Sequence, residues 1–261
     1  MKQILEQILK YRDLLFMLTL RDIKIRYKQA VMGFLWAIFM PMVAVASGLL
    51  IKKAMSVVSG KPMDLASVVS ISVKVLPWTF FVSAIKFSVQ TLVGNSNLVT
   101  KIYFPRVVLP LSSILACLFD FGIAILVLSV LLIIAKIGIS VYILWLPIVL
   151  FLLVLFTAGT GILLASINLF LRDVKYIVEV ILMFGIFFTP VFYDASSVGE
   201  WKIFLLLNPI GSLLESINRV VVLHQMPDLF WLTYAGFCSV VIFFLGIIIF
   251  HRQEPYFAEN I

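Results

Sequence analysis

The sequence predicts an all-α integral membrane protein with six transmembrane helices. Hydrophobic residues make up 63% of the 261 residues and charged residues only 13%, and the mean hydropathy is +1.16. The apolar residues form long unbroken runs, unlike the short alternating segments of a membrane barrel. A helix needs about 20 residues to cross a hydrocarbon core of about 30 Å, so the chain has room for about six spans.

The apolar runs place the spans. We expect them at residues 31–51, 75–98, 110–135, 142–171, 176–193 and 229–250. The segment 52–74 is predicted to be a polar loop, 136–140 a tight turn and 172–175 a return to water. The fifth span is barely long enough to cross.

An amphipathic helix precedes the first span. Apolar residues recur at Ile4, Ile8, Tyr11, Leu15 and Leu18, on one face of a helix that is expected to lie along the membrane surface. Residues 21–28 are too charged for hydrocarbon. The chain therefore divides into an interfacial segment, 1–30, and a membrane domain, 31–261.

Between the fifth and sixth spans lies a segment of mixed character, 194–228. Two apolar stretches, 203–207 and 210–214, are separated by Asn208 and Pro209 and flanked by charged residues. This pattern predicts two short helices, a re-entrant hairpin that dips into the bilayer edge without crossing it.

Basic residues set the orientation. Twelve Lys and Arg residues fall on the side of both termini and of the loops 95–110 and 172–175, and seven fall on the other side. The richer side is expected to be cytoplasmic, so both termini face the cytoplasm and the hairpin faces out. The net charge of +7 is explained by this distribution, and no nucleic acid partner is expected.

The stretch 95–110 organises the rest of the chain. It lies between two predicted spans, yet it is polar, basic and interrupted by two prolines. We expect a short helix or turn at the membrane surface that presents Lys101, Tyr103 and Arg106 to a partner.

Two ionisable residues fall inside predicted spans. Lys86 and Asp120 each lie about ten residues, or about 15 Å, from opposite faces, so both reach the middle of the bilayer. We hypothesise that they form a pair, because buried charges are costly without a partner. The pair is either a tie between neighbouring helices or part of a transport path.

The second span also carries a polar stripe, Thr79, Ser83, Lys86, Gln90 and Asn97, which faces protein or lines a path. In the fourth span, small residues spaced by four indicate a close helix contact. These residues are Thr157, Gly161 and Ala165.

Aromatic rings serve either as interfacial belts and core or as flat apolar faces for sugar rings. The side chains expected along a translocation path combine such rings with the polar stripe and the ionisable pair. They are Trp36, Trp78, Phe80, Phe81, Ser83, Lys86, Phe87, Gln90, Asp120, Phe188, Phe192 and Tyr193.

No catalytic or nucleotide-binding constellation is present in the sequence. Gly60 and Lys61 are followed by Pro62, so the pair does not belong to a phosphate-cradling loop. His224 and His251 are isolated and expected on opposite faces, which argues against a metal site. We therefore expect no enzymatic activity from this chain alone.

Four stretches, taken together, resemble a known family. They are RDIKIRYKQAVMGFLW at 21–36, NLVTKIYFPRVVLPLS at 97–112, LRDVKY at 171–176 with FTPVFY at 188–193, and LNP at 207–209. The chain resembles the permease subunit of type 2 ABC exporters for polysaccharides, the Wzm-like group for O-antigen, teichoic acid and capsule. Val107 departs from the acidic residue expected after Arg106 in many members.

The resemblance implies a homodimer that binds two ATPase subunits and exports a lipid-linked polysaccharide across the bacterial inner membrane, in lipopolysaccharide biosynthesis. ATP and magnesium would belong to the ATPase, and this chain would hold no cofactor. The coupling residues would be Asn97, Thr100, Lys101, Tyr103, Phe104, Pro105, Arg106, Arg172, Asp173, Arg21 and Lys24. The external gate would include Trp201, Asn208, Pro209, Glu215 and Arg219.

Three other functions stay open at this point. An ABC exporter of a drug or lipid has the same architecture. An ion-coupled secondary transporter would use Lys86 and Asp120 as a proton relay and would show inverted repeats, which the hydropathy does not. A membrane glycosyltransferase would need clustered carboxylates or histidines at one face, and the sequence has none.

Overall fold

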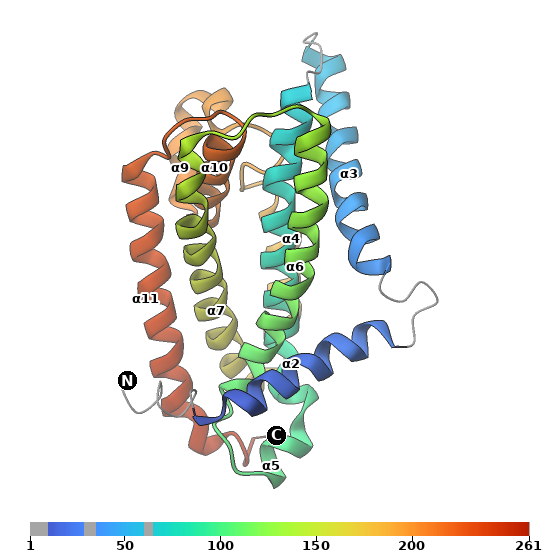
Figure 1. Ribbon diagram of the computed structural model, residues 1–261. Coiled ribbons are helices and arrows are strands. Elements are labelled where there is room, and N and C mark those ends of the chain that lie inside the picture. The colour runs from blue at the N-terminus through green and yellow to red at the C-terminus, as the bar shows by residue number, and fades with distance from the viewer. Residues whose placement is uncertain (1–9, 29–34, 60–64, 261) are drawn as a thin grey trace.

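The computed structural model describes residues 10–28, 35–59 and 65–260, and every regular element in these ranges is helical (Figure 1). Four of the described helical segments are long and apolar enough to cross a membrane. They are the larger part of α4 (Leu65–Gly94), α6 (Val108–Ile134), the turn η1 (Val141–Trp145) with α7 (Leu146–Phe170), and α11 (Leu229–Gln253) with the turn η3 (Glu254–Tyr256).

The remaining elements flank these four or cap their ends. They are α2 (Arg12–Tyr27), α3 (Leu35–Ser59), α5 (Ser96–Lys101), α8 (Val174–Gly185), the turn η2 (Ala195–Trp201), α9 (Lys202–Leu207) and α10 (Pro209–Val221). In Figure 1, α2, α5 and the C-terminus lie at one end of the bundle, and α9 and α10 lie at the other. We call these the α5 end and the α10 end.

Helix α4 is the centre of the bundle. Its apolar segment is 78% buried, whereas those of the other three spanning helices are 17 to 28% buried. Helices α3, α6, α7 and α10 all pack against it. A helix that is apolar around its whole circumference is expected in such a central position, because no face needs water.

Glycines bring helix α7 close to two neighbours. A Cβ atom on Gly159 would lie 2.5 Å from the backbone of Phe243 in α11, and one on Gly246 would lie 2.5 Å from the Gly159 carbonyl oxygen. On the α4 side, a Cβ atom on Gly161 would lie 2.8 Å from the Ser88 hydroxyl oxygen. The close helix contact expected around Thr157, Gly161 and Ala165 is therefore confirmed.

The predicted polar loop 52–74 was wrong over most of its length. Helix α3 continues to Ser59 and α4 begins at Leu65, so Lys74 lies inside a helix with only 1% of its surface exposed. Burial of this lysine is tolerated because it has oxygen partners, described below. The earlier start of α4 also moves Trp78 from a helix end into the protein interior, where it is 5% exposed.

The fifth predicted span is shorter than expected. Helix α8 has 12 residues, about 18 Å of helix, and residues 186–194 continue as turns. Helix α3 has 25 residues and is long enough to cross. Among the described residues, four helical segments are both long and apolar enough to cross by the combined measure of length and composition.

Other expectations agree with the fold. Residues 95–110 contain the short helix α5, and 203–221 form two short helices that meet at Asn208. Helix α10 begins there because the Asn208 side chain accepts a hydrogen bond from the amide of Ile210 and Pro209 occupies the first helical position. The expected apolar positions Ile4 and Ile8 lie outside the described residues.

Candidate functional site

A cavity of about 650 Å³ lies between α2, α3, α4 and α6. Among the described residues that line it are five that were expected along a path: Trp36, Phe80, Ser83, Phe87 and Asp120. The ring of Phe80 stacks on that of Phe121 at 5.0 Å between centroids. The walls are thus mainly aromatic and aliphatic, with a few polar groups.

A second cavity, of about 280 Å³, adjoins the first along α4. It is lined by Trp78 and Phe192, both expected path residues, and it shares Thr79 and Ser83 with the larger cavity. The two cavities bring together seven of the twelve expected path residues along one side of α4.

Other expected path residues line neither cavity. Phe81 is buried in the core against Trp78 and Phe156. Lys86 and Gln90 are exposed, because α3 leans away from the bundle toward its Leu35 end and leaves the lower half of the polar stripe uncovered (Figure 1). Phe188 is exposed, and the Tyr193 hydroxyl donates to the Phe187 carbonyl oxygen.

The hypothesis that Lys86 pairs with Asp120 was wrong. Asp120 instead accepts hydrogen bonds from the Arg26 guanidinium and from the Tyr27 hydroxyl, each at 2.6 Å. Arg26 also lies 4.1 Å over the Phe87 ring. This partner exchange removes the pair on which a proton relay would rest. Burial raises the pKa of Tyr27, and the hydrogen bond to Asp120 adds to the rise.

The sequence contained a signal for this partner. Residues 21–28 are too charged to lie in hydrocarbon without polar partners. Arg26 and Tyr27 find such a partner in the Asp120 carboxylate of α6. Asp22, one turn earlier in α2, also contacts α6, because its carboxylate accepts a hydrogen bond from the Ser112 hydroxyl at 3.2 Å. Helix α2 is therefore held along α6 by polar contacts.

At the α5 end, the 95–107 segment has an exposed and a buried side. Asn97, Thr100 and Lys101 are exposed, and Tyr103 is 96% exposed. Val99 and Phe104 are buried in a hydrophobic cluster that includes residues of α4, α6, α7 and α11. Four of the expected coupling residues thus form one accessible surface on a firmly seated loop.

Arg106 does not join that surface. Its guanidinium donates to the carbonyl oxygens of Glu254 and Val99, and its backbone amide donates to the Glu254 carboxylate at 2.8 Å. Arg106 is half-buried, because the C-terminal segment supplies acceptors for its guanidinium, and it lines a pocket beside Tyr103. Pro105 beside it is half-buried.

The other expected coupling residues have different surroundings. Lys24, Arg172 and Asp173 are exposed, the last two at the junction between α7 and α8. Arg21 is half-buried and paired with Asp22 at 2.9 Å.

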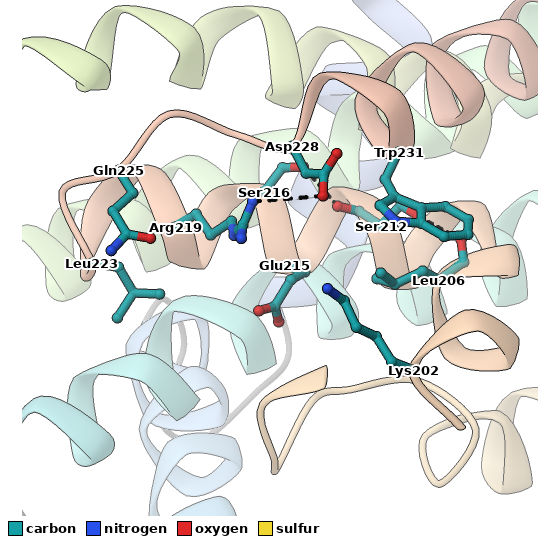
Figure 2. A pocket seen from close by; sticks show the side chains of 10 residues that line it. All are labelled: Lys202, Leu206, Ser212, Glu215, Ser216, Arg219, Leu223, Gln225, Asp228 and Trp231. Atoms are coloured by element: carbon teal, nitrogen blue, oxygen red, sulfur yellow. Dashed lines mark hydrogen bonds and ion pairs between the residues drawn. The ribbon is translucent and has the colours of Figure 1, made fainter. Parts of the chain in front are cut away.

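A polar pocket of about 230 Å³ lies at the α10 end, between α9, α10 and α11 (Figure 2). The Lys202 ammonium and the Glu215 carboxylate point toward one another in it, and Arg219 pairs with Asp228 at 3.8 Å. The pocket therefore holds expected gate residues Glu215 and Arg219, whereas Trp201 is 65% exposed and does not line it.

Beneath this pocket, Lys74 ties α4 to the segment before η2. Its ammonium donates to the Tyr193 carbonyl oxygen at 2.7 Å and to the Asp194 carboxylate at 2.9 Å. Asp194 also accepts from Ser70 at 3.2 Å. Burial raises the pKa of nearby Glu215, the charge of Asp194 adds to the rise, and the charge of Lys74 opposes it. Sequence reasoning missed Lys74, although it lies within a largely apolar run.

The fold defines a multi-pass helical membrane protein. The chain belongs to the ABC-2 type transporter family, whose model matches residues 13–222. It is 28% identical over 264 residues to the O-antigen export system permease protein RfbA of Myxococcus xanthus, with both chains fully covered. It is also 28% identical over 253 residues to the RfbA permease of Klebsiella pneumoniae, covering 95% of this chain and 94% of that one.

Proposed function

We propose that this chain is the membrane subunit of an ATP-driven exporter that moves a lipid-linked polysaccharide of O-antigen type across the bacterial inner membrane. The observation that carries the proposal is the α5 loop, an exposed surface joined directly to α4 and α6, the helices that line the larger cavity. The names of the relatives support polysaccharide as the cargo.

In the membrane, α3 and the shorter α8 act as two further spans, which gives six. The α5 end, with both termini, faces the cytoplasm, because the basic loops gather there. The helices α9 and α10 form a re-entrant hairpin on the outer side. Residues 1–30 are the interfacial segment and 31–261 the membrane domain.

Two ATPase subunits supply the energy, and ATP and magnesium are held by them rather than by this chain. Each ATPase binds the surface formed by Asn97, Thr100, Lys101 and Tyr103. Closure of the ATPases on ATP pushes this surface and tilts α4 and α6. The aromatic walls of the cavity then hold sugar rings without strong hydrogen bonds, so that the polymer slides.

The chain functions as a homodimer in which α3 and α8 face the second copy. Helix α8 supports this, since its exposed side chains Ile177, Val180, Ile181 and Phe184 form an apolar stripe. With Cys117 and Cys238 replaced, a cysteine at Ile181 is expected to cross-link between copies in membranes. A cysteine at Phe237, on the exposed face of α11, is the matched control. If only the cysteine at Phe237 cross-links, the proposed dimer interface at α3 and α8 is wrong.

Reconstitution tests the function as a whole. The chain is assembled with its ATPase in vesicles that contain a fluorescent lipid-linked glycan, and ATP-dependent movement of the glycan into the lumen is measured. Tyr103→Ala is expected to reduce the export rate and binding of the ATPase. Tyr142→Ala, at the opposite end, is expected to leave both unchanged.

The alternatives give different outcomes in the same assay. Export without any ATPase would contradict the proposal, and so would transport that follows an ion gradient. If the assembled complex moves a lipid or drug probe but no glycan, the cargo assigned here is wrong.

A further inference from the structure

The C-terminal segment is built into the α5 end of the molecule. After α11, the chain turns through η3 (Glu254–Tyr256), and the C-terminus lies beside α5 (Figure 1). Phe257 has no exposed surface, and its ring lies 5.0 Å from that of Phe250 and 5.9 Å from that of Phe170. This phenylalanine therefore anchors the segment to both α11 and α7.

The same segment holds the α5 loop through Arg106. The Glu254 carboxylate accepts the Arg106 backbone amide at 2.8 Å, and the Glu254 carbonyl oxygen accepts from its guanidinium at 2.6 Å. The other arm of the guanidinium donates to the Val99 carbonyl oxygen of α5 at 3.2 Å. One arginine thus joins the end of the loop, helix α5 and the end of α11.

This arrangement changes which helices the loop can move. Through the chain alone, α5 is connected to α4 and α6. Val99 and Phe104 also pack in the hydrophobic cluster with α7 and α11. Arg106 and Glu254 add directional hydrogen bonds to this apolar contact, which Phe257 shares. Because α7 and α11 touch at backbone distance along Gly159 and Gly246, a displacement of one end is passed to the pair as a unit.

We propose that Glu254 and Phe257 are positioning residues, and that the C-terminal segment 254–260 is a brace that carries movement of the α5 loop into α11 and α7. The inference rests on the proposed ATPase coupling and adds to it a part of the chain that the family match, 13–222, does not include.

The side chain of Glu254 offers a graded test. Glu254→Ala removes the acceptor for the Arg106 amide, whereas Glu254→Gln keeps an oxygen in that position. Glu259→Ala is the matched control, because Glu259 is exposed in the same segment. Tyr256→Ala, with 58% of the side chain exposed, is the control for Phe257→Ala.

The exchange rate of the Arg106 amide hydrogen tests the contact between Glu254 and the α5 loop without any substrate. In the purified complex with the ATPase, Glu254→Ala is expected to speed exchange of the Arg106 amide by about ten-fold, the effect of losing one hydrogen bond to a charged group. Exchange in Glu254→Gln and Glu259→Ala is expected to match the wild type. Unchanged exchange in Glu254→Ala would overturn the brace, whatever the protein transports.

Coupling is read as glycan exported per ATP hydrolysed in vesicles. Glu254→Ala and Phe257→Ala are expected to lower this ratio several-fold while ATPase binding and ATP hydrolysis persist, and Glu254→Gln is expected to restore it. A normal ratio in Glu254→Ala, or equal losses of export and hydrolysis that follow a loss of folded complex, would overturn the inference. If Phe257→Ala does not fold, the Glu254 series decides. A wild-type complex that exports no glycan would instead contradict the proposed function.

Discussion

The helices α7 and α11 and the helices α3 and α8 are held in opposite ways. The first two meet at backbone distance, where Gly159 and Gly246 leave no room for a Cβ atom. The other two expose large apolar side chains along their lengths, such as Phe39 of α3 and Ile181 of α8. One side of the molecule is fixed by shape and the other is not.

The chain beside α3 and α8 is fastened by charge instead. Before α3, Arg26 of α2 pairs with Asp120 of α6. After α8, Asp194 pairs with Lys74 of α4. Close packing is lost with a small displacement, whereas ends tied by charges allow the helices between them to shift. A rigid side and a tethered side would suit the proposed path beside α3.

The largest effect is expected from breaking the rigid side. In Gly159→Ala, the new Cβ would meet the Phe243 backbone at 2.5 Å, and backbone cannot move away as a side chain does. We expect a loss of about 3 kcal/mol, the upper end of the usual cost of overpacking. Thermal unfolding in detergent measures it, as a fall in Tm of about 10 °C.

Gly122→Ala in α6 is the matched control for this prediction. Nothing lies within 4 Å of its Cβ position, and alanine favours helix, so its Tm should not fall. Equal Tm values for the two variants would mean that α7 and α11 are not in backbone contact.

An effect of similar size is expected from breaking the more buried tie, the pair of Lys74 and Asp194. Asp194→Ala removes the carboxylate that pairs with the Lys74 ammonium at 2.9 Å and leaves it the hydrogen bond to the Tyr193 carbonyl oxygen, on a side chain with 1% of its surface exposed. We expect a loss of about 3 kcal/mol, at the low end for buried pairs because the Asp194 side chain is 40% exposed.

A double mutant separates this tie from general damage. Adding Lys74→Met to Asp194→Ala removes the unpaired charge, and the Tm is expected to recover most of its loss. Asp228→Ala breaks the more exposed pair with Arg219 and should cost no more than about 1 kcal/mol. Additive losses in the double mutant would show that the two groups do not interact.

The rigid side could be predicted from the sequence better than the tethers. Small residues repeated every four positions at Thr157, Gly161 and Ala165 predict close packing of this helix, because the periodicity depends only on one helix. The contact found at Gly161 is with α4, and the sequence did not single out Gly159 or Gly246, which face each other between α7 and α11. The α5 helix was also predictable, since polar residues and prolines between two apolar runs must lie outside hydrocarbon.

The tethers were not predictable, because they join distant parts of the chain. Its predicted depth in the bilayer identified Asp120 as a residue that needs a partner. Lys86 was predicted at the same depth and Arg26 was not, so Lys86 was the expected partner. Lys74 was assigned to a loop because its charge outweighed the apolar residues around it. Arg106 looked like a surface residue until Glu254, 148 positions later, was placed beside it.

A third, smaller effect is expected at the tie before α3. Asp120→Ala removes the acceptor of both Arg26 and Tyr27, whose pair with Asp120 is partly exposed. We expect a loss of about 1–2 kcal/mol, measured again by Tm. Lys86→Leu tests the other partner, and as an exposed residue it should not lower the Tm. A larger loss in Lys86→Leu than in Asp120→Ala would reverse the assignment of the ion pair.

The smallest effect is a pH dependence of stability caused by Glu215, which lies near the pair of Lys74 and Asp194. Burial raises the pKa of Glu215 above its ordinary value of 4.5, so the folded state holds this proton more tightly than the unfolded state. The resulting stability is present below pH 4.5 and is lost as the pH rises through the folded pKa. Glu215→Gln, which stays neutral, should therefore have a higher Tm than the wild type near pH 8, and the gap should close toward pH 4.5. The charged groups that face Glu215 are Lys74, Asp194, Arg219 and Lys202, and all four are present in both proteins. Glu200→Gln, an exposed carboxyl at the same end, should follow the wild type throughout. A gap that widens as the pH falls would mean that the charged form of Glu215 is stabilised, and Lys202, which points at it in Figure 2, would then be its partner.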